Sequence, residues 1–119
     1  MTRPRDIEAR VFALAVTVVR WARVKPAAGI DRDMVRQLVR ASTSVGANLE
    51  EARAAETKRD FVHKISLARK EALEAHYWSR LMLTDSRDET LVRMAGELHE
   101  VSAILSAIAR NSRASSRRG

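Results

Sequence analysis

The sequence predicts an all-α protein, and three observations point to that class. Only four glycines and two prolines interrupt the 119 residues, and alanine, leucine, arginine and glutamate dominate the composition. Apolar residues recur at steps of three and four along four long segments. Residues that favour helix N-termini or turns separate those segments. A chain of this length is expected to form one domain, which gains from burying apolar surface against a partner subunit.

The first helix is expected over residues 5–23, because Pro26 and Gly29 follow it. One face carries a core seam made of Ile7, Val11, Leu14, Val18 and Trp21. Another side carries a second apolar stripe made of Phe12, Val16 and Val19. A helix that is apolar on two sides is expected to be buried on two sides.

The second helix is expected to begin after Asp31, a favourable N-cap, and to run unbroken through the small polar stretch at 42–48. Gly46 in this stretch costs about 1 kcal/mol of helix propensity relative to alanine. The apolar period nevertheless continues through Met34, Leu38, Ala41, Val45, Leu49 and Ala52. The helix therefore gains something in the folded protein that offsets this cost.

A close neighbouring helix would provide that gain. If the second and third helices fold back on each other, Ala41 lies near Ala72, and Val45 lies near Ala68. Asn48 has two interpretations: a buried amide that selects register or oligomeric state, or a side chain that points to solvent.

The third helix is expected from near Lys58 to near Thr84, because Thr57 and Asp60 resemble a capping box. Its apolar face is interrupted by Ser79 and consists of Phe61, Ile65, Ala68, Ala72, Ala75 and Leu83. Ser86 and Glu89 form a second box that begins the last helix. The heptad of the last helix consists of Leu91, Met94, Leu98, Val101, Leu105 and Ile108.

These helices and short connections predict an antiparallel up-down-up-down four-helix bundle. The bundle domain is expected over residues 1–110. Residues 111–119 contain no large apolar residue and are expected to form a flexible, disordered basic tail.

The net charge of +7 is unevenly distributed. Residues 1–40 hold nine Lys or Arg and four Asp or Glu, and residues 110–119 hold four Arg and no acid. This asymmetry suggests a polyanion or an acidic surface as partner, and the alternative is a solubilising tail. Phosphate contacts would give affinity without base specificity. The candidate nucleic-acid-binding residues are Arg3, Arg5, Arg20, Arg23, Lys25, Arg110, Arg113, Arg117 and Arg118.

Other chemistry finds little support. The absence of cysteine excludes disulfides and thiolate chemistry and fits a cytoplasmic protein. The longest apolar run, residues 11–19, is too short to cross a membrane. Asp60 with His63 is one imperfect match to a di-iron motif, so no metal or cofactor is expected. The sequence contains no phosphate loop, G-x-S-x-G motif or dinucleotide fingerprint, and no enzymatic activity is expected.

The stretch TSVGANLEEARAAETKRDFVHKISLARKEALEAHYWSRLM, residues 43–82, resembles a known family. The likeness rests on S-V-G-A-N, on E-A-x-x-A-E-T-K-x-D-F-x-x-K from Glu51, and on K-E-A-x-E-x-x-Y-W from Lys70. The family is that of the 23S rRNA-intervening sequence proteins. The resemblance implies a four-helix bundle that assembles into a ring-like homopentamer without enzymatic activity. A more distant likeness is to the accessory subunit of diversity-generating retroelements, which binds nucleic acid and a reverse transcriptase.

Several signature residues are expected to pack subunits together, as is the second stripe of the first helix. The oligomer-interface candidates are Phe12, Val16, Val19, Asn48, Glu51, Lys64, Glu71, Glu74 and Trp78. The resulting hypothesis is a homo-oligomeric scaffold or accessory protein that binds RNA or DNA through charge. The alternative is a ring that binds a protein partner and has no role with nucleic acid.

Overall fold

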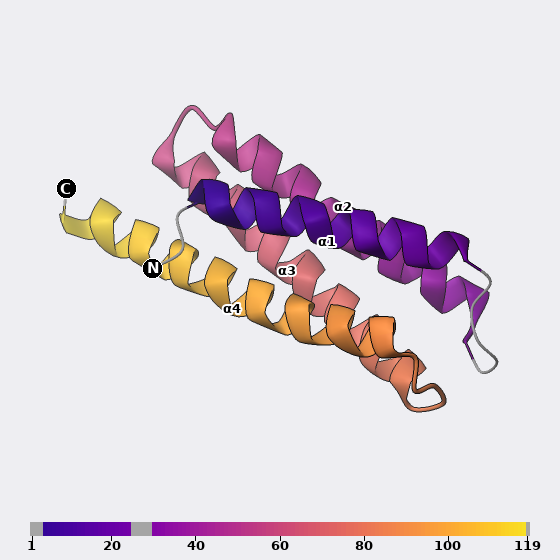
Figure 1. Cartoon of the computed structure of the whole chain (residues 1–119). Helices are drawn as coiled ribbons and strands as arrows, with labels where there is room; N and C mark the ends of the chain where they lie inside the picture. The colour runs from indigo at the N-terminus through magenta and orange to yellow at the C-terminus, as the bar shows by residue number, and fades with distance from the viewer. Residues whose placement is uncertain (1–3, 25–29, 119) are drawn as a thin grey trace.

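The structure, a computed structural model, describes residues 4–24 and 30–118, with side chains over 6–24 and 30–114. The described residues form four helices and no strand: α1 (Pro4–Arg23), α2 (Arg32–Arg53), α3 (Lys58–Leu83) and α4 (Glu89–Arg118). The all-α class is therefore confirmed. The helices lie lengthwise along a body of 54 × 22 × 21 Å (Figure 1).

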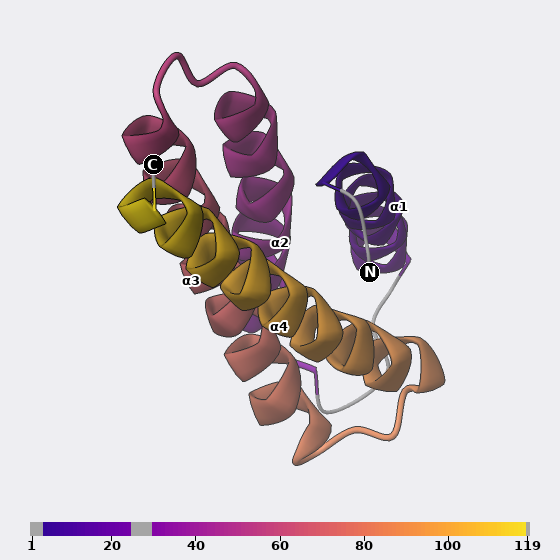
Figure 2. The ribbon, with the colours of Figure 1, turned by 90° about the vertical axis from the view of Figure 1, so that its left-hand side faces the viewer.

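Helices that follow one another in the chain pack side by side, and α1 also contacts α4. The α2–α3 and α3–α4 contacts are the most extensive, while α1 is held less tightly and stands apart from the other three helices in Figure 2. None of the described helices is long and apolar enough to cross a membrane.

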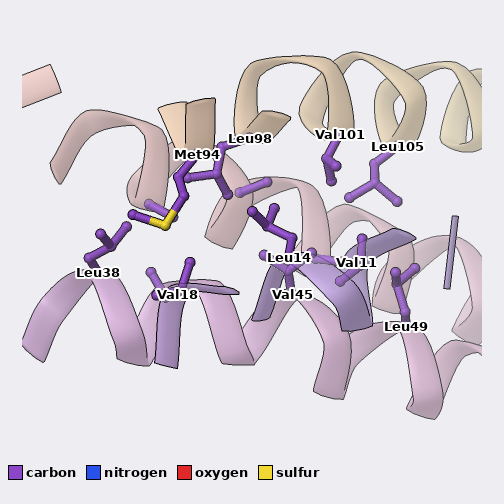
Figure 3. Packing of buried hydrophobic residues seen from close by; sticks show 14 of the residues in the cluster. Val11, Leu14, Val18, Leu38, Val45, Leu49, Met94, Leu98, Val101 and Leu105 are labelled. Carbon is purple, nitrogen blue, oxygen red and sulfur yellow. The ribbon is translucent and has the colours of Figure 1, made fainter. Parts of the chain in front are cut away.

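The predicted seams converge on one apolar core. In Figure 3, Val11 and Leu14 of α1 lie among residues of α2 and α4, including Val45 and Leu98. The fully buried large side chains include Ile7, Val18, Leu38, Leu91, Met94, Val101 and Leu105. Each lies at a position that the three-and-four spacing assigns to the core.

Helix α2 runs unbroken through the glycine and hydroxyl cluster, as predicted. Ala41 and Val45 of α2 are buried, as are Ala68 and Ala72 of α3. Ion pairs confirm the predicted register, since Glu51 late in α2 meets Lys64 early in α3 at 2.7 Å. Small residues therefore line the contact between the two helices, and this contact offsets the propensity lost in α2.

Gly46 itself faces α1. A Cβ atom at this position would lie 3.6 Å from Cγ1 of Val11, which is ordinary van der Waals contact. Replacing Gly46 with alanine is therefore expected to raise the free energy of unfolding by about 0.5–1 kcal/mol, because the helix gains propensity without a clash. Urea unfolding followed by circular dichroism checks this prediction. A loss of stability would show that α1 approaches α2 more closely than the structure indicates.

The structure does not explain why a serine occupies position 42. Its side chain is buried, and its hydroxyl oxygen has no hydrogen-bond partner among the described residues. Thr43 instead donates to the carbonyl oxygen of Val39 at 2.8 Å, one turn earlier. Ser79 of α3 likewise donates to the carbonyl oxygen of Ala75 at 2.9 Å. Ser79 is fully buried, so this polar residue lies on the core face of α3, between apolar residues.

The helix N-termini are confirmed at α2 and α3 and differ at α4. Asp31 accepts the backbone N–H of Asp33 at 2.7 Å, and Thr57 accepts that of Asp60 at 3.0 Å. At α4 the cap is Asp88, not Ser86, because Asp88 Oδ1 accepts the backbone N–H of Leu91 at 2.9 Å. The negative charge of a carboxylate at the N-cap also interacts favourably with the positive end of the helix dipole.

Helix α4 is longer than predicted. It was expected to end at Arg110, with a flexible tail beyond, but it continues to Arg118. No glycine or proline lies between these two residues to stop the helix. Arg113 Nη2 donates to Ser66 Oγ of α3 at 3.0 Å, which ties this part of α4 to the bundle. The helix thus passes residue 110 without a break, and the domain boundary at that residue stays a prediction.

Candidate interaction surfaces

The signature carboxylates lie along the contact between α2 and α3. Arg40 of α2 pairs with Glu71 at 3.4 Å and with Glu74, while Trp78 Nε1 donates to Glu74 Oε2 at 3.1 Å. A hydrogen bond from Lys64 to Glu51 raises the pKa of Lys64. These interface candidates therefore have partners within the subunit, so their charges stabilise the pairing of α2 and α3.

Asn48 is half-buried, which lies between its two predicted interpretations. Its Nδ2 donates to the carbonyl oxygen of Ser44 at 2.9 Å, within the same helix. That bond satisfies part of the amide without a partner on another helix.

Phe12 lies on the outer face of α1. It is 71% exposed, more than any other large apolar side chain that the structure describes in this helix. Phe12 borders two shallow grooves. One runs along α1 past Val16 and Val19 to Arg23. The other lies between α1 and α2 and has the small residues Gly46, Ala47, Thr43 and Ala15 in its lining. We call this surface the α1 face; it consists of Phe12, Ala15, Val16, Val19, Gly46 and Ala47.

The predicted basic residues do not form one cluster. Arg20 and Arg23 lie in the last turn of α1, whereas Arg110 and Arg113 lie late in α4. Figure 1 shows that these two segments are at opposite ends of the bundle. Arg3 and Lys25 lie outside the described residues, and the side chains of Arg5, Arg117 and Arg118 lie outside the described side chains.

Sequence reasoning missed Arg69, which accompanies the late α4 arginines. Its Nε donates to Ser106 Oγ of α4 at 2.7 Å, so it lies on the same side of the bundle as Arg113. The signal was present in the spacing, because Arg69 is three residues after Ser66. Its significance appears only when α4 is known to lie alongside.

Two histidines from α3 and α4 also meet on this side. The rings of His76 and His99 have centroids 5.4 Å apart. Burial lowers the pKa of His76, and the charges of His99 and Arg80 add to this effect. No group of three or more potential metal ligands occurs among the described residues, so the pair lacks the carboxylates of a di-iron site.

The His76 environment predicts a pH dependence of stability. Because the pKa is lower in the folded state, unfolding takes up a proton when the pH falls below the ordinary histidine value of about 6.5. The melting temperature is therefore expected to fall between about pH 7 and pH 5. Replacing His76 with glutamine should flatten this profile in thermal scans. The matched control is exposed His63 in the same helix, whose replacement by glutamine should leave the profile unchanged.

Comparisons with known proteins agree with this architecture. The family model described as "23S rRNA-intervening sequence protein" matches residues 6–107. A solved structure from Bacteroides thetaiotaomicron, a protein of unknown function from the S23 ribosomal protein family, is 26% identical with a TM-score of 0.82. The match covers 92% of this chain and 99% of that chain. No curated protein matches the chain.

Proposed function

Because the chain belongs to the 23S rRNA-intervening sequence protein family, we propose that it is a non-enzymatic scaffold that assembles from several copies and associates with RNA or DNA through charge. The subunit is an up-down-up-down antiparallel bundle, and the assembly is the homopentamer that the family resemblance implies. The role is that of an accessory protein, as in the more distant likeness to the retroelement subunit.

The exposure of Phe12 carries the proposal of assembly. An aromatic ring that is 71% exposed on the α1 face lacks the hydrophobic free energy that burial would give. The α1 face continues onto small residues of α2, which leave room for a side chain from another copy. A ring needs a contact between two different surfaces of the subunit, so this face would meet a different surface of the next copy.

The net charge supports association with nucleic acid. A protein of charge +7 attracts phosphate backbones over the range of the ionic atmosphere, and a ring multiplies that charge. Such binding neutralises phosphates without reading bases and weakens steeply with salt.

The solution mass of the purified protein, together with its ratio of nucleic acid to protein absorbance, tests both halves of the proposal. An assembly that retains or shifts structured RNA at low salt supports them. A monomer of 13.4 kDa that is free of nucleic acid contradicts both. An assembly that binds a protein partner tightly and retains no RNA at low salt would favour the alternative, an adaptor ring.

A further inference from the structure

Among the side chains that the structure describes, ion pairs join neighbouring helices at three of the four contacts of the bundle. Arg53 of α2 pairs with Glu8 of α1, and Arg10 of α1 pairs with Glu97 and Glu100 of α4. Between α2 and α3, Arg40 pairs with Glu71 and Glu74, and Lys64 pairs with Glu51. None of these pairs crosses from α3 to α4. The carboxylates of α3 and α4 that form them are thereby turned toward α2 and α1.

Arginines instead meet neutral hydroxyl groups where α3 and α4 pack together. Arg69 of α3 donates to Ser106 Oγ at 2.7 Å, and Arg113 of α4 donates to Ser66 Oγ at 3.0 Å. Both arginines are exposed. A hydroxyl oxygen positions a guanidinium but does not neutralise it, so each arginine keeps its full charge.

Helical spacing adds two more exposed arginines to the same side. Arg110 lies four residues after Ser106 and three before Arg113, and Arg80 lies four residues after His76. We call the set Ser66, Arg69, His76, Arg80, His99, Ser106, Arg110 and Arg113 the α3–α4 strip. At 1.5 Å per residue, Arg69 and Arg80 are separated by about 16 Å along α3. The strip is therefore a row of positive charges, not a compact pocket.

We propose that the α3–α4 strip is the surface that binds the phosphate backbone of nucleic acid, an inference that rests on the proposed function. A row of charges fits a linear polyanion. Arginine matches phosphate through two parallel N–H···O bonds, and the serines hold Arg69 and Arg113 in place before binding. Phosphate oxygens would replace or join the serine oxygens as acceptors. The strip offers contacts to the backbone and no aromatic stack for bases.

The double variant Arg69→Gln/Arg113→Gln tests this inference by fluorescence anisotropy with an RNA hairpin and a DNA duplex of equal length. Binding is expected to weaken by about tenfold or more, and the slope of log affinity against log salt should decrease by about two. The matched control is Arg36→Gln/Arg87→Gln, which removes the same charge from exposed positions elsewhere. Arg36 pairs with Asp33 within α2. Arg87 lies in the connection from α3 to α4, at the end of the bundle opposite to Arg113.

A second variant, Ser66→Glu/Ser106→Glu, keeps both arginines and places a carboxylate beside each. It should weaken binding as the double arginine variant does, and it separates loss of charge from any effect of losing the arginine side chains. Circular dichroism of all variants verifies that the helices are intact.

The outcomes separate the strip from the wider proposal. If the strip and control variants weaken binding equally, nucleic acid is bound by net charge alone, and the strip is overturned while the proposed function stands. If the unaltered protein binds neither RNA nor DNA at low salt, both are overturned. If poly-glutamate binds the strip more tightly than RNA, the surface recognises an acidic protein and the inference is wrong.

Discussion

Replacing Phe12 with aspartate is expected to reduce the solution mass of the protein to that of one 13.4-kDa chain. Phe12 projects from the α1 face and is 71% exposed in the subunit, so its loss creates no cavity in the core. In an assembly that buries this ring, the substitution would place a carboxylate in an apolar contact. Burying an unpaired carboxylate in that contact costs more free energy than the rest of the contact supplies, so the assembly should dissociate. Light scattering after gel filtration measures the mass.

The matched control is Val92→Asp in α4, which also removes an exposed apolar side chain and adds one negative charge. Val92 is 51% exposed and lies away from the α1 face. Its variant should keep the mass of the unaltered protein. If both variants remain assembled at micromolar concentration, copies meet through another surface and α1 is not the interface. The helix content of both variants should match that of the unaltered protein.

The same substitution separates assembly from nucleic-acid binding. The α1 face and the α3–α4 strip use different residues, and Arg69 and Arg113 are exposed within one subunit. A dissociated Phe12→Asp protein should therefore still bind RNA, but more weakly, because the proposed ring would present several strips at once. The double arginine variant of the strip should then weaken RNA binding by the same factor in the Phe12→Asp background as in the unaltered protein.

The spacing of apolar residues was sufficient to predict the four helices and most of the core. Val11, Leu38, Leu98 and Leu105 are buried where a period near 3.6 places them, since core packing requires that period. Residues at the ends of helices were less predictable. Asp88, rather than Ser86, caps the N-terminus of α4. Both side chains accept a backbone N–H group, and the sequence alone does not indicate which of them caps the helix.

The charged surfaces were less predictable than the core, because the partners of their side chains lie on other helices. Glu51 and Lys64 are predicted interface residues, and the structure adds an ion pair between them across α2 and α3 that the sequence did not predict. Arg69 lies three residues after Ser66 in its own helix, but its contact with Ser106 depends on how α3 and α4 pack together. Periodicity identifies which side of a helix is apolar. It does not identify which polar side chain on the next helix lies opposite.

Replacing Ala72 with leucine is expected to lower the free energy of unfolding by about 2–3 kcal/mol. Ala72 is 0% exposed and lies where α2 and α3 pack through small residues, with buried Ala41 predicted opposite it. A leucine side chain would force the two helices apart or adopt a strained rotamer. Separation would also disturb the neighbouring Arg40–Glu71 contact, which spans the same helices. Urea unfolding monitored by circular dichroism gives the free energy of unfolding.

The measurement is clearest in the Phe12→Asp background, where assembly does not add its own concentration-dependent stability. The matched control is Ala103→Leu in the middle of α4, where the side chain is exposed and the added atoms meet solvent. That variant should change the free energy of unfolding by no more than about 0.5 kcal/mol. Equal stability of the two variants would mean that α2 and α3 have room for larger side chains. Close approach would then no longer explain why α2 tolerates glycine and serine in its centre, because the lost helix propensity would have no compensating contact.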